Sequence, residues 1–449
     1  MVRLLQFLAL ALASLALMTR PALAQQILRD AETEAFMADM SAPLVKAAGM
    51  APNNVQVLVI NDPEINAFVA GGQYVWVHSG LIAQADNVNQ LQGVVAHELG
   101  HIEGGHIIRS GEGIKDATSV TLLSLVLGAA AIAAGGAKAG MGIMGLGQQA
   151  AMSRFLAFSR AQESSADLAG ARYLHTAGIS GRGSLEFFKK LQNQEYRLAI
   201  PQDNSYGRTH PLSGERINVL REVYAVDPAW DKPIDPQLEA RFERIKAKLI
   251  GFVSEPQQTL IKYPESDQSL PAHYARAYAW HKSAYPQKAL AEADALLAAE
   301  PHDPYFLELK GQILLESGRP ADAVAPLREA VRRTNQPLIS VLLAHALIAT
   351  EDPANFAEAE QVLRVAVQRD RENPFAWYQL GVVYERRGDT PRAALATAER
   401  YAMMGDHNLA LRSADVAVQG LQPGTVDYLR AQDIAMTSRA AVEQQRKKR

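Results

Sequence analysis

The pattern of hydrophobic and polar positions changes along the first half of the chain. Residues 27–50 have the spacing of an amphipathic helix. The stretches "NNVQVLVIND" (53–62) and "INAFVAGGQYVWVHSGLI" (65–82) are rich in Val, Ile, Tyr and Trp, which is typical of strands. Gly71-Gly72 separates two such runs and predicts a hairpin turn. Helices are then expected over 86–109, 151–177, 181–198 and about 235–251, with a loop at 203–217.

An apolar insert follows the predicted helix 86–109. Residues 117–136, "ATSVTLLSLVLGAAAIAAGG", carry no charge. Their length would suffice for a transmembrane helix, but the last third is Ala and Gly, which favours a buried or membrane-surface helical hairpin. The glycine-rich "GGAKAGMGIMGLGQQ" (135–149) is expected to be mobile. It has neither the Lys-Ser/Thr ending nor the preceding strand of a phosphate-binding loop.

The second half of the chain contains an internal repeat from about residue 270. One unit contains Gly311, and another contains W-x₂-L-G-x₂-Y at 377–384, completed by Gly388 and Ala393. Gly311 and Gly381 lie 70 residues apart, which is two periods of about 34 plus a two-residue insertion. This is the tetratricopeptide signature. Stacked helix pairs of this kind form a concave superhelix.

Length and composition limit the classes of function. A chain of 449 residues is too long for one hydrophobic core, so two or three domains are expected. A net charge of −3 argues against a nucleic-acid-binding protein, which usually carries a basic face. We expect a first domain over 25–252, a linker over 253–269 and the repeats over 270–449.

The N-terminus predicts export. Met1-Val2-Arg3 gives a positive start, residues 4–18 form an apolar run, and Ala22 and Ala24 fit the cleavage pattern of a signal peptide. A membrane anchor is the alternative, but the apolar run is short for a span. We expect a signal peptide over 1–24, cleavage after Ala24 and a periplasmic protein. The chain has no cysteine, so neither disulfides nor a lipidated cysteine are available.

The stretch "GVVAHELGHIEGGH" (93–106) is the strongest chemical signal. On a helix, His97 and His101 are about 40° apart around the axis and about 6 Å apart along it, so both can bind one ion. Glu98 lies about 100° around from His97 and can reach a water on the ion without being a ligand. This HExxH arrangement is that of zinc peptidases, with the carboxylate as general base.

A third ligand has to come from another segment. His106 is about 140° around from His101 on a continuous helix, so we expect an ordinary surface or core-edge histidine there. "SRAQESSADLAGARYL" (159–174) offers Glu163 and Asp167 on one helix face. Glu163 can complete a two-His, one-Glu zinc site, and Asp167 can accept a hydrogen bond from a ligand imidazole. A solvated acidic face is the alternative for this helix.

These motifs together resemble a known family. HELGH, the later Glu163-x₃-Asp167 and the preceding "NAFVAGGQYVWVHSGLI" resemble the HtpX-type zinc metallopeptidases. With a signal peptide ahead and repeats behind, the chain after residue 25 is similar to the periplasmic BepA-type subgroup, the β-barrel assembly-enhancing proteases. The resemblance implies a mainly α fold, with an α+β, gluzincin-like zinc-metallopeptidase domain that contains a small β-hairpin sheet. An α-solenoid of tetratricopeptide repeats would follow.

The resemblance also implies roles for single residues. The ligands of one Zn²⁺ would be His97, His101 and Glu163, with Glu98 as catalytic base and Asp167 bonded to a ligand. "THPL" (209–212) resembles a segment whose histidine, here His210, occupies the open position of the zinc and holds the enzyme off. An ordinary loop histidine before a proline is the alternative for His210.

Substrates and partners follow from the same resemblance. The strand around Asn66–Ala70 would be the edge on which an extended substrate adds as a strand. We expect an exported zinc endopeptidase for unfolded or stalled outer-membrane proteins, with the repeats docking on the barrel-assembly machinery. The insert 117–149 is a candidate for peripheral membrane contact, and no nucleic acid is expected as a partner. The alternatives are a chaperone or scaffold with a latched, mostly silent site, and an integral membrane peptidase anchored through 117–136.

Overall fold

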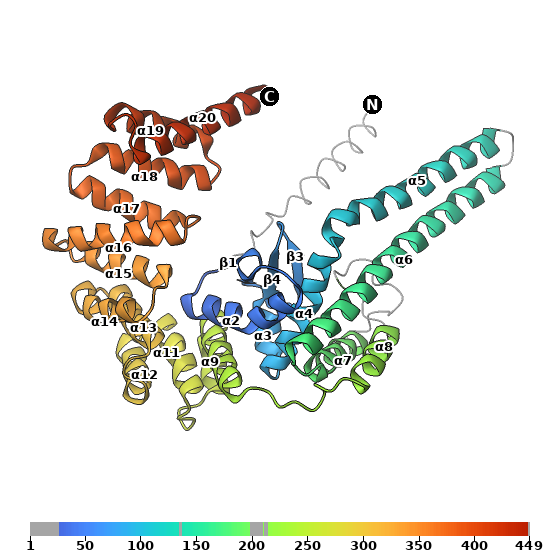
Figure 1. Ribbon diagram of the computed structural model, residues 1–449, viewed down its shortest axis with the longest axis horizontal. Coiled ribbons are helices and arrows are strands. Elements are labelled where there is room, and N and C mark those ends of the chain that lie inside the picture. The colour runs from blue at the N-terminus through green and yellow to red at the C-terminus, as the bar shows by residue number, and fades with distance from the viewer. Residues whose placement is uncertain (1–26, 134–136, 198–209, 211–213, 448–449) are drawn as a thin grey trace, which may run out of the picture.

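The computed structural model describes residues 27–133, 137–197, 210 and 214–447. The predicted signal peptide, 1–24, lies outside these residues. A small domain with a β-sheet is followed by stacked helix pairs, and a helical hairpin projects from the domain on the side away from the repeats (Figure 1). The predicted fold class, mainly α with a small sheet and a helical solenoid, is confirmed.

A four-stranded sheet in the order β1-β2-β4-β3 organises the first domain. Its strands are β1 (Ile27–Leu28), β2 (Gln56–Ile60), β3 (Ala67–Ala70) and β4 (Tyr74–His78). β3 and β4 form the predicted hairpin, and Gly71 and Gly72 at its turn have φ of +70° and +102°, which glycine adopts readily. β2 runs parallel to β4, and β1 runs antiparallel to β2. β3 is therefore an edge strand of the described sheet.

Helices cover this sheet, directly or through other helices, and complete the core. They are α2 (Ala31–Ala47), α3 (Ser79–Gln84), α4 (Val88–Glu103), α6 (Ala137–Ala177), α7 (Arg182–Arg197), α8 (Gly214–Ala225) and α9 (Pro236–Val253), with a 3₁₀ turn η1 (Pro52–Asn54). Val75 and Val77 of β4 and Leu91 and Val95 of α4 share one fully buried cluster. The Asn87 side chain accepts a hydrogen bond from the amide of Gln90 and so caps the start of α4. The HELGH motif therefore lies on a buried helix.

α5 (His106–Ala133) and the first half of α6 form the predicted helical hairpin. Residues 137–149 of the stretch that is expected to be mobile lie in the helix α6. One glycine of this stretch serves close packing: a Cβ at Gly147 would lie 1.9 Å from the Cβ of Ser124 on α5. No helix in the described part of the chain combines the length and apolar character that crossing a membrane requires.

The helices after residue 270 pair as the predicted repeats. They are α11 (Leu270–Lys282), α12 (Pro286–Ala299), α13 (Pro304–Glu316), α14 (Pro320–Arg333), α15 (Pro337–Ala349), α16 (Phe356–Arg369), α17 (Pro374–Arg386), α18 (Thr390–Met403), α19 (His407–Gly420) and α20 (Val426–Lys447). Gly311 is needed for close pairing, because a Cβ there would lie 2.3 Å from Leu327 Cγ on the next helix. The extra spacing between Gly311 and Gly381 falls in the α15–α16 connection, where the turn η2 (Pro353–Asn355) lengthens the loop.

Charged residues join the first domain to the repeats. The predicted linker, 253–269, contains the helix α10 (Pro256–Lys262). Glu32 at the start of α2 accepts hydrogen bonds from Tyr274 Oη of α11 at 2.6 Å and from Lys248 Nζ of α9 at 3.2 Å. Arg244 of α9 contacts Glu32 and donates to Asp303 Oδ1, just before α13, at 2.9 Å. Since these groups are largely buried, they fix the repeats against α2 and α9.

Candidate metal centre

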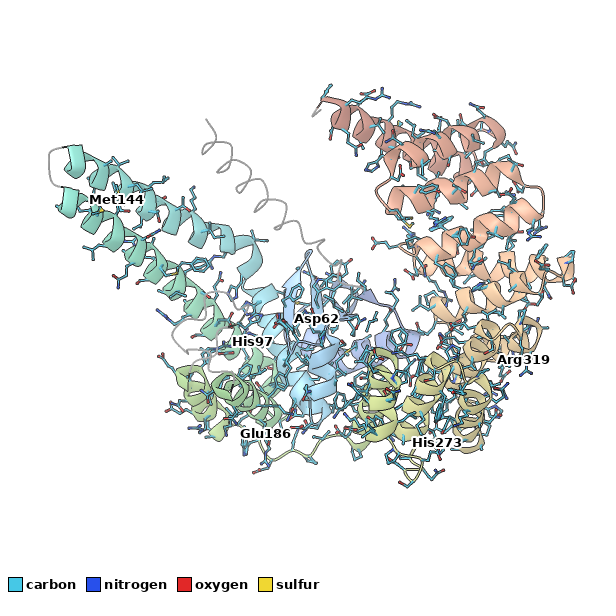
Figure 2. All side chains as sticks on the ribbon, turned by 180° about the vertical axis from the view of Figure 1, so that it is seen from behind. Asp62, His97, Met144, Glu186, His273 and Arg319 are labelled. Carbon is cyan, nitrogen blue, oxygen red and sulfur yellow. The ribbon has the colours of Figure 1, made fainter. Side chains whose placement is uncertain are left out.

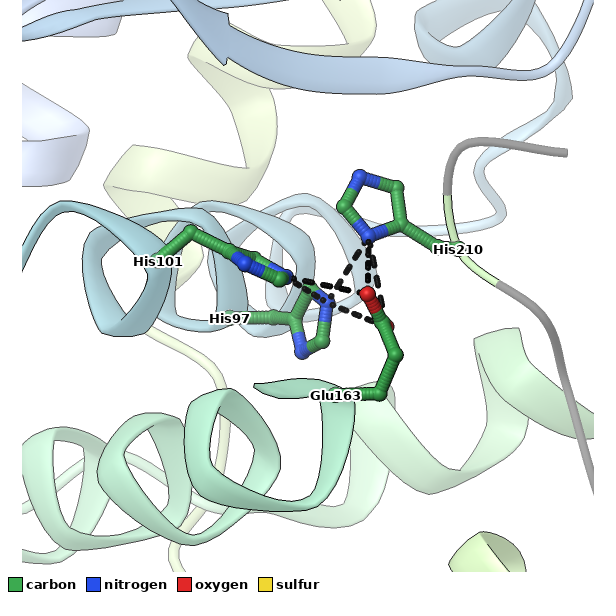
Figure 3. Close-up of side chains that lie close together, drawn as sticks. All are labelled: His97, His101, Glu163 and His210. Atoms are coloured by element: carbon green, nitrogen blue, oxygen red, sulfur yellow. Dashed lines mark hydrogen bonds and ion pairs between the residues drawn. The ribbon is translucent and has the colours of Figure 1, made fainter. Parts of the chain in front are cut away.

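Four side chains from α4, α6 and the segment before α8 converge on one point (Figure 3). Nε2 of His97 and Nε2 of His101 are 3.1 Å apart. The two carboxylate oxygens of Glu163 each lie 3.4 Å from one of these nitrogens. His210 Nδ1 lies 3.4 Å from His97 Nε2 and 3.1 Å from Glu163 Oε1. Four potential metal ligands thus face one another within 4.8 Å.

The packing of α4 against α6 explains this convergence. His97 and His101 point the same way because one helical turn separates them. Glu163 can reach them because the two helices approach closely at two glycines. A Cβ at Gly100 would lie 2.6 Å from the carbonyl oxygen of Ala166, and a Cβ at Gly170 would lie 3.0 Å from the backbone nitrogen of His97. Larger side chains at either glycine would push the Glu163 carboxylate away from the histidines.

The distances fit a tetrahedral metal ion. Two ligand atoms at the usual zinc bond lengths of about 2.0–2.1 Å and at a tetrahedral angle are about 3.3 Å apart. The separations between the nitrogens and oxygens of His97, His101, Glu163 and His210 given above lie between 3.1 and 3.4 Å. Two imidazoles and a carboxylate would leave one position of a four-coordinate ion, and His210 Nδ1 is a fourth candidate ligand atom. The described residues therefore fit a bound metal ion.

Glu98 lies directly beside this cluster. It is 1% exposed, and its Oε1 lies 3.4 Å from His210 Nε2. Its Oε2 is buried without a hydrogen-bond partner. A buried carboxylate oxygen without a partner costs stability, so its retention calls for a functional reason. Glu98 is placed to accept a proton from a group that enters the position of His210.

Asp167 orients one of the two histidines. Its Oδ1 lies 2.9 Å from His97 Nδ1, on the side of the ring opposite to the cluster. A proton held on Nδ1 leaves the Nε2 lone pair free for a metal ion. Burial opposes the charge on His97, but Asp167 and Glu163 outweigh it and raise the pKa of His97 to about 10. Burial and the neighbouring charge of His97 lower the pKa of His101 to about 2.

Arg216 is a site residue that the sequence analysis missed. It lies on α8 and donates from Nε and Nη2 to the two oxygens of Asp167 at 2.6 and 2.8 Å. Its Nη1 lies 3.0 Å from Glu163 Oε2. A signal was available, because Arg216 shares the i, i+4, i+8 face of its helix with the buried residues Leu220 and Tyr224. A charged residue on such a face needs a buried partner.

The expectation for His106 is wrong. Its Nδ1 lies 2.9 Å from His101 Nδ1, and the side chain is 6% exposed. The angle expected from a continuous helix does not apply, because α4 ends at Glu103 and Gly105 adopts φ of +59° before α5 begins. His106 therefore contacts the Nδ1 side of the His101 ring, opposite to the cluster. Asp167 lies in the same way against Nδ1 of His97.

A second group of potential ligands lies after β2 and at the end of β4. It consists of Asp62, Glu64 and His78. His78 Nδ1 is 3.5 Å from Asp62 Oδ1, which already accepts a hydrogen bond from the amide of Glu64 at 2.9 Å. Glu64 is exposed. The group thus lacks the buried, converging geometry of the first cluster.

The predicted substrate edge lies beside the cluster. β3 packs against α4, the helix that carries His97, Glu98 and His101. On its other side β3 has no partner strand in the described sheet. An extended chain could pair with this edge and run past the cluster.

Comparison with known proteins finds relatives that match most of the chain. The beta-barrel assembly-enhancing protease of Escherichia coli K12 is 25% identical over 394 residues, which cover 86% of this chain and 79% of that protein. The protein of the same name from Yersinia pestis is 24% identical over 380 residues, covering 83% of this chain and 76% of the relative. Metalloprotease LoiP of Escherichia coli K12 is 30% identical over 176 residues, covering 39% of this chain and 64% of LoiP.

Family matches divide the chain as the fold does. Residues 28–224 match peptidase family M48, and residues 285–336 and 343–408 match tetratricopeptide repeats. The matched peptidase segment contains all of the converging residues described above. The chain is therefore a metalloendopeptidase, with a first domain that matches peptidase family M48 and tetratricopeptide repeats after it.

Proposed function

We propose that this chain is an exported, zinc-dependent endopeptidase that cleaves unfolded or misassembled outer-membrane proteins. One observation carries the proposal: the ligand atoms of His97, His101 and Glu163 face one another at 3.1–3.4 Å, beside the unpartnered carboxylate oxygen of Glu98. Two imidazoles and one carboxylate are the ligands of catalytic zinc in many peptidases. We therefore assign these three residues as ligands and Glu98 as the catalytic base.

The residues of the chain divide the reaction between them. When bound, zinc lowers the pKa of water and polarises the peptide carbonyl. Glu98 takes the proton of the attacking water and passes it to the leaving amine. Asp167 keeps the proton of His97 on Nδ1, and Arg216 holds Asp167 and Glu163 in place. The edge of β3 aligns the substrate as an added strand, which favours extended, unfolded chains.

Two observations support outer-membrane proteins as substrates. The relatives in Escherichia coli and Yersinia pestis are named for β-barrel assembly, and they match over most of this chain. A chain that has not completed its barrel exposes unpaired strands, and such strands can add to β3. The signal-peptide pattern over 1–24 supports a periplasmic location.

The repeats supply a surface for partners. A cavity of about 770 Å³ lies between β1 and the inner helices of the repeats. Its walls are largely apolar, with Leu338, Val341 and Leu342 of α15 opposite Ile27 and Phe252. We propose that the barrel-assembly machinery docks on the repeats, where it would bring substrate to β3.

The test is digestion of unfolded casein by the chain that starts at Gln25. Glu98→Gln is the matched variant, because it keeps the size of the side chain and the metal ligands and removes only the base. Cleavage by the wild type that disappears in Glu98→Gln at equal zinc content supports the proposal. Equal cleavage by both proteins would show that Glu98 is not the base.

His210 favours a second role as a chaperone. Its ring fills the position between the ligands and Glu98, so the site as described is closed to substrate. We propose that His210 is a latch, and that the latched protein binds outer-membrane proteins without cutting them. Suppression of aggregation of an unfolded outer-membrane protein by Glu98→Gln, to the same extent as by the wild type, would support this role.

A further inference from the structure

The outer part of the α5–α6 hairpin exposes apolar side chains. Figure 2 shows Met144 near the end of the projecting hairpin, far from His97. On α5, the residues Leu122, Leu123, Leu125, Val126 and Leu127 are between 46% and 66% exposed. On α6, Met141 and Leu146 are 64% and 68% exposed. We call residues 122–133 and 137–147 the apolar tip.

The apolar tip has about the same length on both helices. Apart from Ser124 and Lys138, the first polar residues counted from the tip are Thr121 on α5 and Gln148 on α6. At 1.5 Å per residue, each border lies about 17 Å from the far end of its helix. The hydrocarbon of one leaflet is about 15 Å deep, half of a core of about 30 Å. The tip thus has the length that one leaflet accommodates.

The distribution of apolar groups around α5 is that of a helix in lipid. With 100° per residue, the five exposed side chains from Leu122 to Leu127 cover about 200° of the helix surface. Ser124 is buried and faces Gly147 of α6. A helix that docks on a protein groove or on a second copy presents one apolar stripe. A helix that is apolar on every side except the one that packs against its partner helix is typical of a lipid environment.

Three hydroxyl groups of α5 bond within their own helix. Thr118 donates to the carbonyl oxygen of Ile114, Ser119 to that of Lys115 and Ser124 to that of Thr121, each at 2.8 Å. In hydrocarbon, polar groups have no water to bond with, so internal partners are required. The Ser124 hydroxyl, which lies inside the tip, therefore does not oppose insertion.

Basic residues lie where lipid headgroups would be. Lys115 and Arg154 are exposed, and each is six residues, about 9 Å, beyond the polar border of its helix. Five basic and two acidic residues occur between 106 and 160. This excess complements anionic headgroups. Lys138 is the one charged residue within the tip, and its charge opposes deep burial.

We propose that the apolar tip inserts into one leaflet of an anionic lipid bilayer, with Lys115 and Arg154 at the headgroups. Glu163 is 15 residues beyond Gln148 on α6, so the metal centre stands about 22 Å from the hydrocarbon if the hairpin is upright. Insertion would hold the peptidase next to chains at the membrane surface. The proposal concerns binding alone and does not depend on the proposed activity.

The test uses vesicles of phosphatidylethanolamine with phosphatidylglycerol, and vesicles of phosphatidylcholine. Because the chain has no cysteine, Leu125→Cys and Leu146→Cys can each carry one polarity-sensitive fluorophore. Ile261→Cys is the matched control, since Ile261 is 81% exposed on α10, outside the hairpin. We expect a blue shift of the label at 125 and 146 with anionic vesicles, and none at 261.

Sedimentation with the vesicles gives a second readout. The double variant Leu125→Gln with Val126→Gln is expected to reduce vesicle binding at least tenfold, and Lys138→Leu to strengthen it. Circular dichroism controls for folding. An unshifted label at 125, or equal binding by the double variant, overturns insertion. A label that is shielded without vesicles in a protein of dimer mass would instead assign the tip to a second copy. Equal binding to phosphatidylcholine would contradict the part played by Lys115 and Arg154.

Discussion

Arg216 donates two hydrogen bonds, of 2.6 and 2.8 Å, to the carboxylate of Asp167. The pair is buried, and the third guanidinium nitrogen lies 3.0 Å from Glu163. One arginine on α8 therefore links a metal-ligand candidate to the carboxylate that orients His97. His210 lies six residues before Arg216 in the sequence.

Replacement of Arg216 by Met is expected to destabilise the fold by about 3–5 kcal/mol, because it leaves two buried carboxylates without their cation. Thermal unfolding measures this loss. Arg221→Met is the matched control on the same helix, since Arg221 is exposed and donates a hydrogen bond to the exposed side chain of Asn218. Arg216→Lys should recover part of the stability and little of the zinc affinity, since it cannot bond both oxygens of Asp167. Equal stability of the Arg216 and Arg221 variants would refute the linking role.

His106 is expected to support zinc binding through His101. Its Nδ1 lies 2.9 Å from His101 Nδ1, and a hydrogen bond donated by His101 Nδ1 would leave His101 Nε2 for the metal. His106→Ala should lower zinc affinity by about 10–100-fold, the usual cost of removing such a partner. Competition with a zinc chelator measures the affinity, with the exposed His302→Ala as control. Unchanged affinity in His106→Ala would assign the contact to packing alone.

Gly100 is expected to be intolerant of a side chain. A Cβ there would lie 2.6–3.1 Å from backbone atoms of Ala166, so Gly100→Ala forces α6 away from α4. We expect a loss of about 1–3 kcal/mol in the free energy of unfolding, together with weaker zinc binding because Glu163 moves with α6. Gly145→Ala is the control, since nothing lies within 4 Å of a Cβ there. It should instead stabilise the helix by about 0.5–1 kcal/mol. If Gly100→Ala destabilises the fold less than Gly145→Ala does, the account is contradicted.

Glu308 is expected to make stability fall with rising pH. Burial, which outweighs the attraction of Lys248, raises the pKa of Glu308 from 4.5 to about 8, with Asp30 and Glu32 adding to the rise. Its Oε2 is buried without a partner at the cavity of the repeats. The folded state then holds a proton that the unfolded state has lost, so the contribution is full below pH 4.5 and disappears as pH rises to about 8.

The variant Glu308→Gln removes this titration. Between pH 5 and 8.5 its melting temperature should fall less than that of the wild type, and at pH 8.5 it should be the more stable protein. Each unit of the pKa difference is worth about 1.4 kcal/mol, so the gap should reach several degrees. If the melting temperatures of the wild type and of Glu308→Gln change equally with pH across this range, Glu308 is solvated.

The sequence allowed much of this structure to be predicted, for identifiable reasons. The spacing of His97 and His101 fixes their geometry on any helix, and Trp377 to Ala393 carry a repeat signature. The small residues after Glu163 indicated the close helix contact that Gly170 makes with His97. These features depend on local periodicity, which a sequence displays directly.

The remaining features depend on where the chain turns. Gly105 breaks the helix and returns His106 to His101, which no helical extrapolation could give. β1 is two residues long, and its pairing with β2 is visible only once the sheet has formed. Arg216 reaches Asp167 across 49 residues of chain. Gly147 belongs to a stretch whose glycines suggest mobility, and its packing partner, Ser124, lies on another helix.

The central claim is that a complete peptidase site is held closed by His210. The most direct test is the rate of casein cleavage by His210→Ala and by the wild type, at equal zinc content per chain. His210 Nδ1 lies 3.1 Å from Glu163, so its removal should open one position beside Glu98 and leave the three ligands in place. We predict faster cleavage by His210→Ala, with one zinc per chain in both proteins, and no cleavage when Glu98→Gln is added. Slower cleavage by His210→Ala at full zinc content would contradict the latch and make His210 part of the catalytic machinery.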